Sequence, residues 1–506
     1  MRSRLSRRLM IVASLAPIVG PLLYQPELLA ADLREEVRRS FDRTVTIAGS
    51  PLLRVDHRNG DVRVRAHARS ELKIQATIRV SANTRADAAA FADRIQIDVR
   101  EAASGVTITT QYPTYRDSRR DLSYSVDYDL LVPERWPLDV HNRFGDVSVT
   151  GMKAATTIVN ANGSVSTADG SGRYHLENSF GTIDAARLLG DLTIRSANGS
   201  VSAISVTGAV SVTNRFGAVI ARTVRGDVLI ANSNGTIEAS GISGKADLRT
   251  TFGGVEVRDV GSLWVSSQNG SVSGANVGGS ASVNATFGEV TLRNVARDAR
   301  VENANGSVSV QDVRGGADLS TRFGRIEAQG VKGGLRVMSA NGPITVIDVD
   351  GAVFLKTSFG PVLAERVRGA LTVDNANGGV QATTIGGPAT VSSSFGPVVV
   401  RDIDGRVDVR NRNGSVEAWP RARQGGCNDV ALSTSFSRMD VHLPDTGYAV
   451  NARTTFGRIA AEVPITSTGL IGGNAVSGTI GRGGCALQLT NANGDIKILR
   501  AVAGAR

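Results

Sequence analysis

Residues 305–324 read NGSVSVQDVRGGADLSTRFG, and this stretch contains the pattern that decides the fold. Apolar side chains recur on one predicted face of it, at Val308, Val310, Val313, Ala317 and Leu319. Alternation of apolar and polar residues is typical of strands with one buried face. Gly306 and Gly315 stand nine residues apart, which predicts two short strands, each closed by a glycine corner.

The same unit recurs along residues 145–414. A glycine follows Phe or Asn every 18 residues, with one step of 17 between Gly253 and Gly270. The residue before this glycine alternates strictly between two series. The first is Phe144, Phe180, Phe216, Phe252, Phe287, Phe323, Phe359 and Phe395, and the second is Asn162, Asn198, Asn234, Asn269, Asn305, Asn341, Asn377 and Asn413. One unit cannot bury its own apolar face, so the units are expected to stack.

Stacked short strands with tight corners predict an all-β fold, a single-stranded parallel β-solenoid (β-helix) built from 18-residue units. A coil of 18 residues would place two faces about 10 Å apart, which is a normal sheet separation. A coil of 36 residues would stack Phe on Phe and Asn on Asn, but its wide interior would be hard to fill. We therefore favour the 18-residue coil.

The flanks of the repeat differ from it in composition. Residues 32–140 predict a small mixed α+β cap, with a helix over 84–93 and strands over 72–80, 94–99 and 106–111. The repeats occupy 141–418, and 419–506 predict further repeats and a β cap, because repeat stacks need atypical ends. The positions Asn59-Gly60, Phe436, Phe456-Gly457 and Asn493-Gly494 resemble repeat corners.

Residues 1–31 resemble an export signal. A basic segment from Arg2 to Arg8 precedes a short apolar segment over 9–23, which Pro17 interrupts. About 20 unbroken apolar residues are needed to cross a bilayer, so we expect removal of the leader and no transmembrane span after it. The predicted location is the periplasm, the cell surface or the extracellular space.

The net charge of +10 is mild for 506 residues, and the leader contributes part of it. Lys and Arg are not clustered among aromatic residues, so nucleic acid is not an expected partner. An anionic envelope or extracellular polysaccharide, or an envelope protein, fits better. Arg143, Arg215 and Arg322 precede corner phenylalanines and could form part of a basic stripe for anionic glycans, but ordinary solubilising charge is the favoured explanation.

The chain has two cysteines, Cys427 and Cys485, both in Gly-Gly-Cys contexts. In an oxidising compartment they could pair and tie the C-terminal region together. Two cysteines without a nearby histidine cluster supply too few ligands for a metal, so no metal site is predicted. The sequence also has no phosphate loop or dinucleotide motif, and we expect no cofactor.

The alternating Asn-Gly-x-Val and Phe-Gly-x-Val units resemble the bacterial toastrack or putative-adhesin family, a group of β-strand repeat domains of unknown function. The opening residues 59–64, residues 131–133 before the first Phe-Gly unit and the closing residues 489–496 fit the same resemblance. It covers nearly the whole mature chain. The resemblance implies an exported envelope protein with a role in adhesion or envelope-stress signalling, and it supplies no catalytic motif.

The Phe series allows two interpretations. It could form a stripe on which carbohydrate stacks, but the inward phase of the alternation favours core packing. The Asn series could bind polar ligands, but turn geometry explains it better, because Asn tolerates left-handed backbone and Asn-Gly is a strong turn pair.

Catalysis would need paired carboxylates in a groove. Asp348 with Asp350, and Asp402 with Asp404, are the nearest candidates, and each pair adjoins a corner glycine where Asp is a common turn residue. The unbroken register leaves no long loop to build a cleft, so no catalytic residue is predicted. The leading hypothesis is a non-catalytic adhesin-like or structural β-solenoid of the cell envelope. The alternatives are a polysaccharide lyase or hydrolase on a β-helix, and an envelope-stress signalling module.

Overall fold

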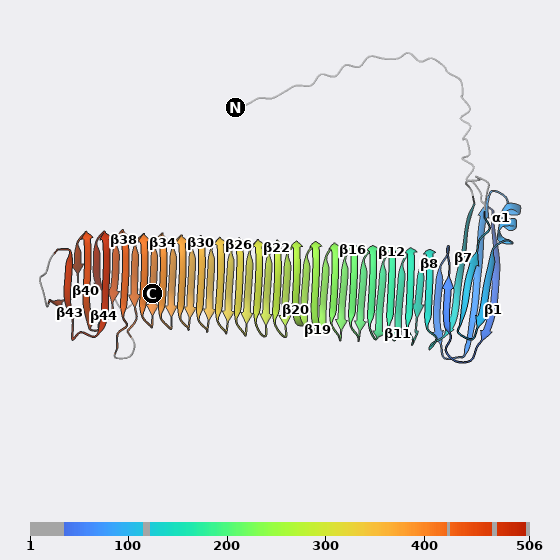
Figure 1. Cartoon of the computed structure of the whole chain (residues 1–506), viewed down its shortest axis with the longest axis horizontal. Helices are drawn as coiled ribbons and strands as arrows, with labels where there is room; N and C mark the ends of the chain where they lie inside the picture. Colours follow the sequence, from blue (N-terminus) through green and yellow to red (C-terminus); the bar gives the residue numbers. More distant parts are fainter. Residues whose placement is uncertain (1–34, 115–121, 423–425, 468–472, 502–506) are drawn as a thin grey trace, which may run out of the picture.

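The computed structural model describes residues 35–114, 122–422, 426–467 and 473–501, so the predicted export signal lies outside the described residues. Within these ranges 45 strands join into one continuous sheet that winds into a long rod (Figure 1), with one helix at its N-terminal end. The predicted all-β solenoid of parallel stacked strands is confirmed. No helix in the described part of the chain is both long and apolar enough to cross a membrane.

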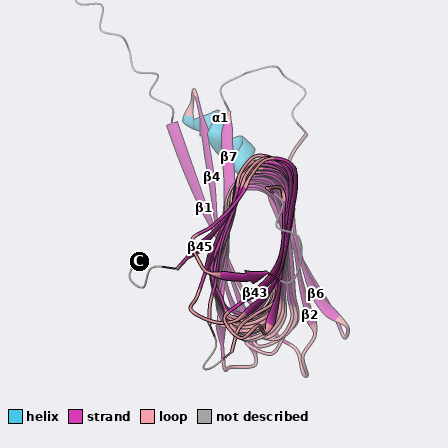
Figure 2. Cartoon of the chain, turned by 90° about the vertical axis from the view of Figure 1, so that its left-hand side faces the viewer, coloured by secondary structure: helices cyan, strands magenta, loops and turns pink. Residues whose placement is uncertain are grey.

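Two parallel faces make up the rod, and in the view down its axis the coils lie over one another as a flattened ring (Figure 2). The first face consists of β8 (Leu138–Phe144), β10 (Thr156–Asn162), β12 (Tyr174–Phe180), β14 (Leu192–Asn198), β16 (Val210–Phe216), β18 (Val228–Asn234), the second halves of β19 (Ile237–Phe252) and β20 (Val255–Asn269), β22 (Ala281–Phe287), β24 (Ala299–Asn305), β26 (Ala317–Phe323), β28 (Leu335–Asn341), β30 (Val353–Phe359), β32 (Leu371–Asn377), β34 (Ala389–Phe395), β36 (Val407–Asn413) and β38 (Val430–Phe436). The second face consists of β9 (Val147–Thr150), β11 (Val165–Ser171), β13 (Ile183–Leu189), β15 (Val201–Val206), β17 (Val219–Val224), the first halves of β19 and β20, β21 (Val272–Val277), β23 (Val290–Val295), β25 (Val308–Val313), β27 (Ile326–Val331), β29 (Ile344–Val349), β31 (Val362–Val367), β33 (Val380–Ile385), β35 (Val398–Ile403), β37 (Val416–Pro420) and β39 (Met439–Leu443).

Each coil has about 18 residues, because each strand pairs in parallel with the strand two further along the chain. In the β24–β26 pair Val301 lies beside Leu319, and Asn305 lies beside Phe323. The favoured coil size is therefore correct, and the 36-residue coil is excluded. As a consequence, corner phenylalanines stack on corner asparagines and not on one another.

The interior is a narrow apolar core between the two faces. Val308, Val310 and Leu319 are fully buried, as are the matching Val, Ile, Leu and Ala residues of the other coils. Val313 is also buried although it breaks strict alternation, because Asp312 before it has left-handed backbone (φ 57°) and acts as a bulge. This left-handed position recurs in fifteen consecutive coils, at Gly151, Asp169, Arg187, Ser205, Thr223, Gly241, Asp259, Asn276, Asn294, Asp312, Gly330, Asp348, Arg366, Thr384 and Asp402.

At the N-terminal end the order of coils along the rod differs from their order along the chain. The coil of β2 (Leu52–Asp56) and β3 (Val62–His67) lies between β8–β9 and the coil of β6 (Gly105–Gln111) and β7 (Ser123–Pro133). Antiparallel strands β1 (Glu35–Thr46) and β4 (Glu71–Ala82) extend the sheet beyond β7, and β5 (Gln96–Ala102) pairs with β6. Helix α1 (Arg85–Ala92), capped by Thr84, packs against β1 and β4 (Figure 1).

The C-terminal end is interleaved in the same way. The coil of β44 (Cys485–Asn493) and β45 (Ile496–Arg500) lies between β38–β39 and the coil of β40 (Tyr448–Phe456) and β41 (Ile459–Ala461). Antiparallel strand β43 (Ala475–Ile480) pairs with β40, and β42 (Ile465–Ser467) pairs with β43. A disulfide joins Cys427, before β38, to Cys485 at the start of β44, with a Cα–Cα distance of 5.8 Å.

Loss of this disulfide is expected to loosen the intercalated β44–β45 coil. Closing a loop of 58 residues stabilises a fold by about 2–4 kcal/mol, mainly by restricting the unfolded chain. The double variant Cys427→Ser, Cys485→Ser should therefore show faster amide hydrogen exchange in β44 and β45 than the wild type. Exchange in the central coils, such as β24 and β26, serves as the internal control. Equal exchange of β44 in both proteins would show that packing alone holds the coil.

A buried histidine lies in the N-terminal coils. His57 is 7% exposed, its Nδ1 lies 3.0 Å from Thr110 Oγ1, and Tyr128 contacts its ring edge-on. Burial lowers the pKa of His57 from 6.5 to about 4, because the charged imidazolium would lose its hydration.

Acidification from pH 6.5 to 4 is therefore expected to destabilise these coils. In this window the unfolded chain binds a proton at His57 and the folded chain does not, so stability falls as the pH falls, by up to roughly 3 kcal/mol. The check is the urea midpoint of the wild type and of His57→Gln at several pH values. The wild type should lose more stability than the variant across the window. Parallel losses would show that His57 does not titrate in this way.

Candidate binding surface

The corner phenylalanines are exposed, which corrects the prediction that they pack in the core. Their exposed fractions run from 46% to 72%, and we call the column that they form with the corner asparagines the corner ladder. Its phenylalanines are Phe144, Phe180, Phe216, Phe252, Phe287, Phe323, Phe359, Phe395, Phe436 and Phe456, and its asparagines are Asn59, Asn162, Asn198, Asn234, Asn269, Asn305, Asn341, Asn377, Asn413 and Asn493.

The exposure has a geometric cause. The last inward side chain of each first-face strand is two residues before the ladder position, and it is a small or polar residue such as Thr321 or Asn303. Asn303 Nδ2 donates a hydrogen bond to Gly288 O of the neighbouring coil at 2.9 Å, and the buried face ends there. The chain then turns at a glycine of positive φ, so Phe323 lies at the edge of the flattened coil instead of inside it.

The ladder asparagines are half-buried and lie between the protruding phenylalanines. Asn162 Nδ2 donates to the Arg143 carbonyl at 3.2 Å, and Asn305 Nδ2 donates to the Thr286 carbonyl at 3.4 Å. The same bond to the neighbouring coil occurs at Asn198, Asn234, Asn269, Asn377 and Asn493. In these seven asparagines the amide nitrogen is committed to the backbone, which leaves the amide oxygen as the acceptor at the half-buried corner.

Phe and Asn alternate along the rod even where they do not alternate along the chain. In the C-terminal region the chain order is Phe436, Phe456, Asn493, but the order along the rod is Phe436, Asn493, Phe456. At the other end, Asn59 belongs to the interleaved coil of β2 and β3, and its backbone pairs with that of Phe144 in the next coil. Tandem duplication of a two-unit repeat would not by itself produce this order, because the terminal coils are placed out of chain order.

Among the coils that carry the corner ladder, from Asn59 to Phe456, the irregularities of coil length lie at the opposite corner. Beyond Asn59, the connection from β6 to β7 is longer than in the repeats and joins those strands on the ladder side. The one 17-residue step of the repeat lacks a residue near Gly261, where the pairing of β19 with β20 shifts. Asn269 nevertheless still pairs with both Phe252 and Phe287. The longer connection before β38 also lies on that side, and Phe436 still pairs with Asn413. The corner ladder therefore stays continuous along the rod, whereas the opposite corner varies.

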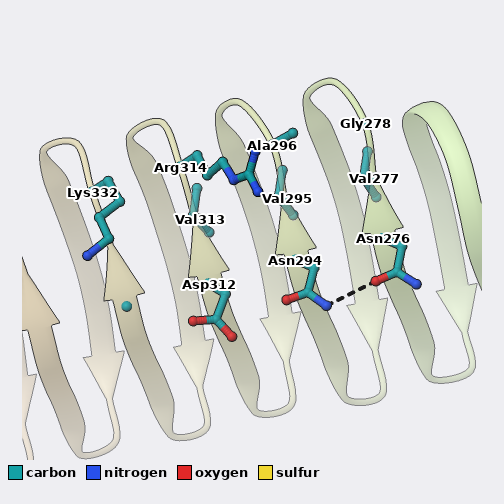
Figure 3. A pocket seen from close by; sticks show the side chains of 11 residues that line it. Asn276, Val277, Gly278, Asn294, Val295, Ala296, Asp312, Val313, Arg314 and Lys332 are labelled. Carbon is teal, nitrogen blue, oxygen red and sulfur yellow. Dashed lines mark hydrogen bonds between the residues drawn. The ribbon is translucent and has the colours of Figure 1, made fainter.

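The opposite corner carries polar side chains and shallow grooves. Asn276 Nδ2 donates to Asp259, and Asn294 Nδ2 donates to Asn276, each at 2.9 Å. Figure 3 shows the groove of about 470 Å³ beside them, with Asp312 and Lys332 further along the same edge. The next groove, of about 600 Å³, includes three of the four candidate carboxylates, Asp348, Asp350 and Asp404.

These carboxylates are held in ion pairs. Asp348 accepts two hydrogen bonds from Arg366, at 2.6 and 3.1 Å, and these bonds lower the pKa of the Asp348 carboxyl below its ordinary value. Asp350 lies 3.2 Å from both Lys332 and Arg368. A general acid for glycoside cleavage needs a raised pKa instead. Asp348 is thus suited to holding neighbouring coils together.

The remaining candidates are separated along the rod. Asp402 occupies the left-handed position three coils from Asp348, and Asp404 pairs with Arg421 at 3.7 Å. Arg143, Arg215 and Arg322 are exposed beside the corner ladder, but several coils separate each from the next, so they do not form a continuous stripe. Among the described residues no group of three or more His, Cys, Asp or Glu is placed to hold a metal ion.

The fold and the corner ladder define a class, a β-solenoid repeat protein with one exposed aromatic edge. No family model and no curated protein matches the chain. Two solved structures are similar to parts of it. One is a "putative cell adhesion protein" from Clostridium sporogenes (8% identity, 47% of this chain and 100% of that chain, TM-score 0.17), and the other a "putative adhesin" from Bacteroides fragilis (13% identity, 62% and 97%, TM-score 0.17). These TM-scores are too low for either likeness to carry a conclusion.

Proposed function

We propose that the protein is an exported, non-catalytic, adhesin-like β-solenoid of the cell envelope, and that the corner ladder is its binding surface for a long polymer. The observation that carries this proposal is the row of ten exposed phenylalanines along one edge. Large exposed apolar side chains gathered along one edge commonly mark a binding site, whereas singly scattered ones do not. A regular row of weak contacts also yields high avidity for a repetitive ligand.

The alternative of a polysaccharide-cleaving enzyme has weaker support. It rests on the groove beside Asp348, Asp350 and Asp404, whose carboxylates are engaged by Arg and Lys side chains. An adhesive role uses the regular edge of the rod, which is the feature that stays constant where the rest of the coil varies in length.

The test uses the chain without its predicted leader, mixed with a panel of neutral and anionic polysaccharides and separated by size exclusion. Protein and polymer are both followed. Co-elution with polymer of unchanged length is the expected result. Shortened polymer would contradict the non-catalytic proposal and direct attention to the groove at Asp348, and absence of co-elution with every polymer would contradict the binding proposal.

A further inference from the structure

The repeat of the corner ladder sets the size of the ligand unit that it fits. Neighbouring coils lie ~4.8 Å apart, so successive ladder phenylalanines, two coils apart, are separated by about 10 Å. The ladder asparagines lie halfway between them and are recessed. Along its whole length the edge therefore repeats a protruding aromatic ring and a recessed amide.

The shape of the surface favours a thread-like ligand over a second folded protein. The ladder is one residue wide. The exposed positions before the phenylalanines are Ser, Thr or Arg, as at Thr286 and Arg322, and the positions after the corner glycines include Asp146 and Glu289. The core of a protein–protein interface is a two-dimensional apolar patch. A single row of rings between polar margins matches a single extended chain instead.

The charge beside the ladder favours a neutral ligand. The exposed arginines that precede ladder residues are Arg143, Arg215, Arg322 and Arg412. The positions after the corners carry both signs, with Asp146 and Glu289 but also Arg325 and Arg438. None of these charges recurs with the period of the phenylalanines. A periodic anionic polymer would call for a periodic cation. The elements that do recur are an aromatic ring and an amide, which are the groups that stack on and hydrogen-bond to uncharged sugars.

We infer that the corner ladder binds an extended, unbranched, neutral polysaccharide with a two-sugar repeat, of the β-1,4-linked kind. This inference rests on the proposed function. In such a chain each sugar is turned over relative to the last, so the same ring face recurs once per disaccharide, at a spacing comparable with that of the ladder phenylalanines. One phenylalanine stacks under every second sugar, and the ladder amide faces the sugar between.

A phase-shift variant tests the inference, because it keeps the number of exposed rings and changes only their spacing. Four Phe–Asn pairs are exchanged in the second half of the ladder by Phe287→Asn, Asn305→Phe, Phe323→Asn, Asn341→Phe, Phe359→Asn, Asn377→Phe, Phe395→Asn and Asn413→Phe. This moves four of the ten rings by one coil. The control replaces Phe287, Phe323, Phe359 and Phe395 with tyrosine, which keeps the rings in phase. Circular dichroism and thermal unfolding verify that both variants fold.

The probes are soluble β-1,4-linked glucan, β-1,4-linked N-acetylglucosamine oligomers of increasing length, and an α-linked glucan that does not extend. We expect at least one β-linked probe to bind the wild type and the tyrosine control, and to bind the phase-shift variant about tenfold or more weakly, because no uninterrupted run of in-phase rings is then longer than four. Affinity for the oligomers should rise in steps of two sugars.

Equal binding by the wild type and the phase-shift variant would overturn the disaccharide inference and leave general adhesion through the rings intact. Equal binding of α-linked and β-linked glucan would also overturn the disaccharide inference without affecting the proposed adhesion through the rings. If the wild type bound only an anionic polymer, or if sedimentation showed self-association through the ladder in place of sugar binding, the inference would be wrong. If substitution of the phenylalanines changed no polymer binding at all, the proposed function would also fail.

Discussion

Replacement of Phe216, Phe252, Phe287 and Phe323 by alanine is expected to weaken polymer binding by about 100-fold or more, with little change in the temperature of unfolding. Each ring is largely exposed, so it contributes little to the core. A multivalent contact, however, loses affinity multiplicatively as its units are removed. Binding to a polymer-coated surface and thermal unfolding, measured on the same preparations, check the two halves of this prediction.

Exposed leucines outside the corner ladder provide the matched control. Leu189 and Leu229 are 60% and 43% exposed, and they lie away from the ladder positions. Leu189→Ala with Leu229→Ala should leave polymer binding unchanged, because these side chains do not recur from coil to coil. Equal loss of binding in the leucine and phenylalanine variants would indicate non-specific hydrophobic adsorption.

Replacement of Gly306 by alanine is expected to destabilise the central coils by about 4 kcal/mol, which is at the upper end for a single substitution. Gly306 has a φ of 143°, and a Cβ there would lie 2.0 Å from the Gly288 carbonyl oxygen of the next coil. The Gly288 carbonyl is part of the backbone, so it can move away from the Cβ only if the two coils move apart. That movement would weaken the hydrogen bonds between the coils. Chemical unfolding and limited proteolysis between residues 288 and 324 measure the effect.

Gly254→Ala is the control for that substitution. Gly254 follows a corner glycine directly, its φ is not positive, and a Cβ there would meet no atom closer than 3.7 Å. Alanine should be neutral or slightly stabilising, because it restricts the unfolded chain without a contact in the fold. If Gly306→Ala proved as mild as Gly254→Ala, close backbone approach at the corners would not be what demands glycine.

The repetitive part of the fold could be predicted from sequence because each coil repeats the same local physics. The strands were predicted from the alternation at Val308, Val310 and Leu319. The corners and the stacking of coils were predicted from the glycine that recurs every 18 residues. The exposure of Phe323 was not predicted, because a count of alternate residues does not show where the buried face ends. The signal was present at Thr321, a polar inward residue that closes the core before the corner.

The interleaved ends could not be predicted for a different reason. Pairing of β38 with β44, and of β44 with β40, is a non-local choice that the local pattern of each strand leaves open. A sequence clue did exist, since Phe436 and Phe456 are consecutive corner residues without an intervening corner asparagine. The Phe series was weighed from sequence as a carbohydrate-stacking stripe and was assigned to the core because of its phase. Only the extension of the corner ladder to Asn59, Asn493 and Phe456 required the spatial order of the terminal coils.

Hydroxyl-radical footprinting with mass spectrometry tests directly whether the polymer binds along the corner ladder, since each ladder phenylalanine reports on its own accessibility. The protein is oxidised with and without the polymer to which it binds most tightly. We expect protection of the ladder phenylalanines from Phe144 to Phe456, with unchanged oxidation of Leu189 and Leu229, which are exposed elsewhere. Protection at those two leucines or at the grooves of the opposite corner, with the phenylalanines unprotected, would contradict binding through the corner ladder.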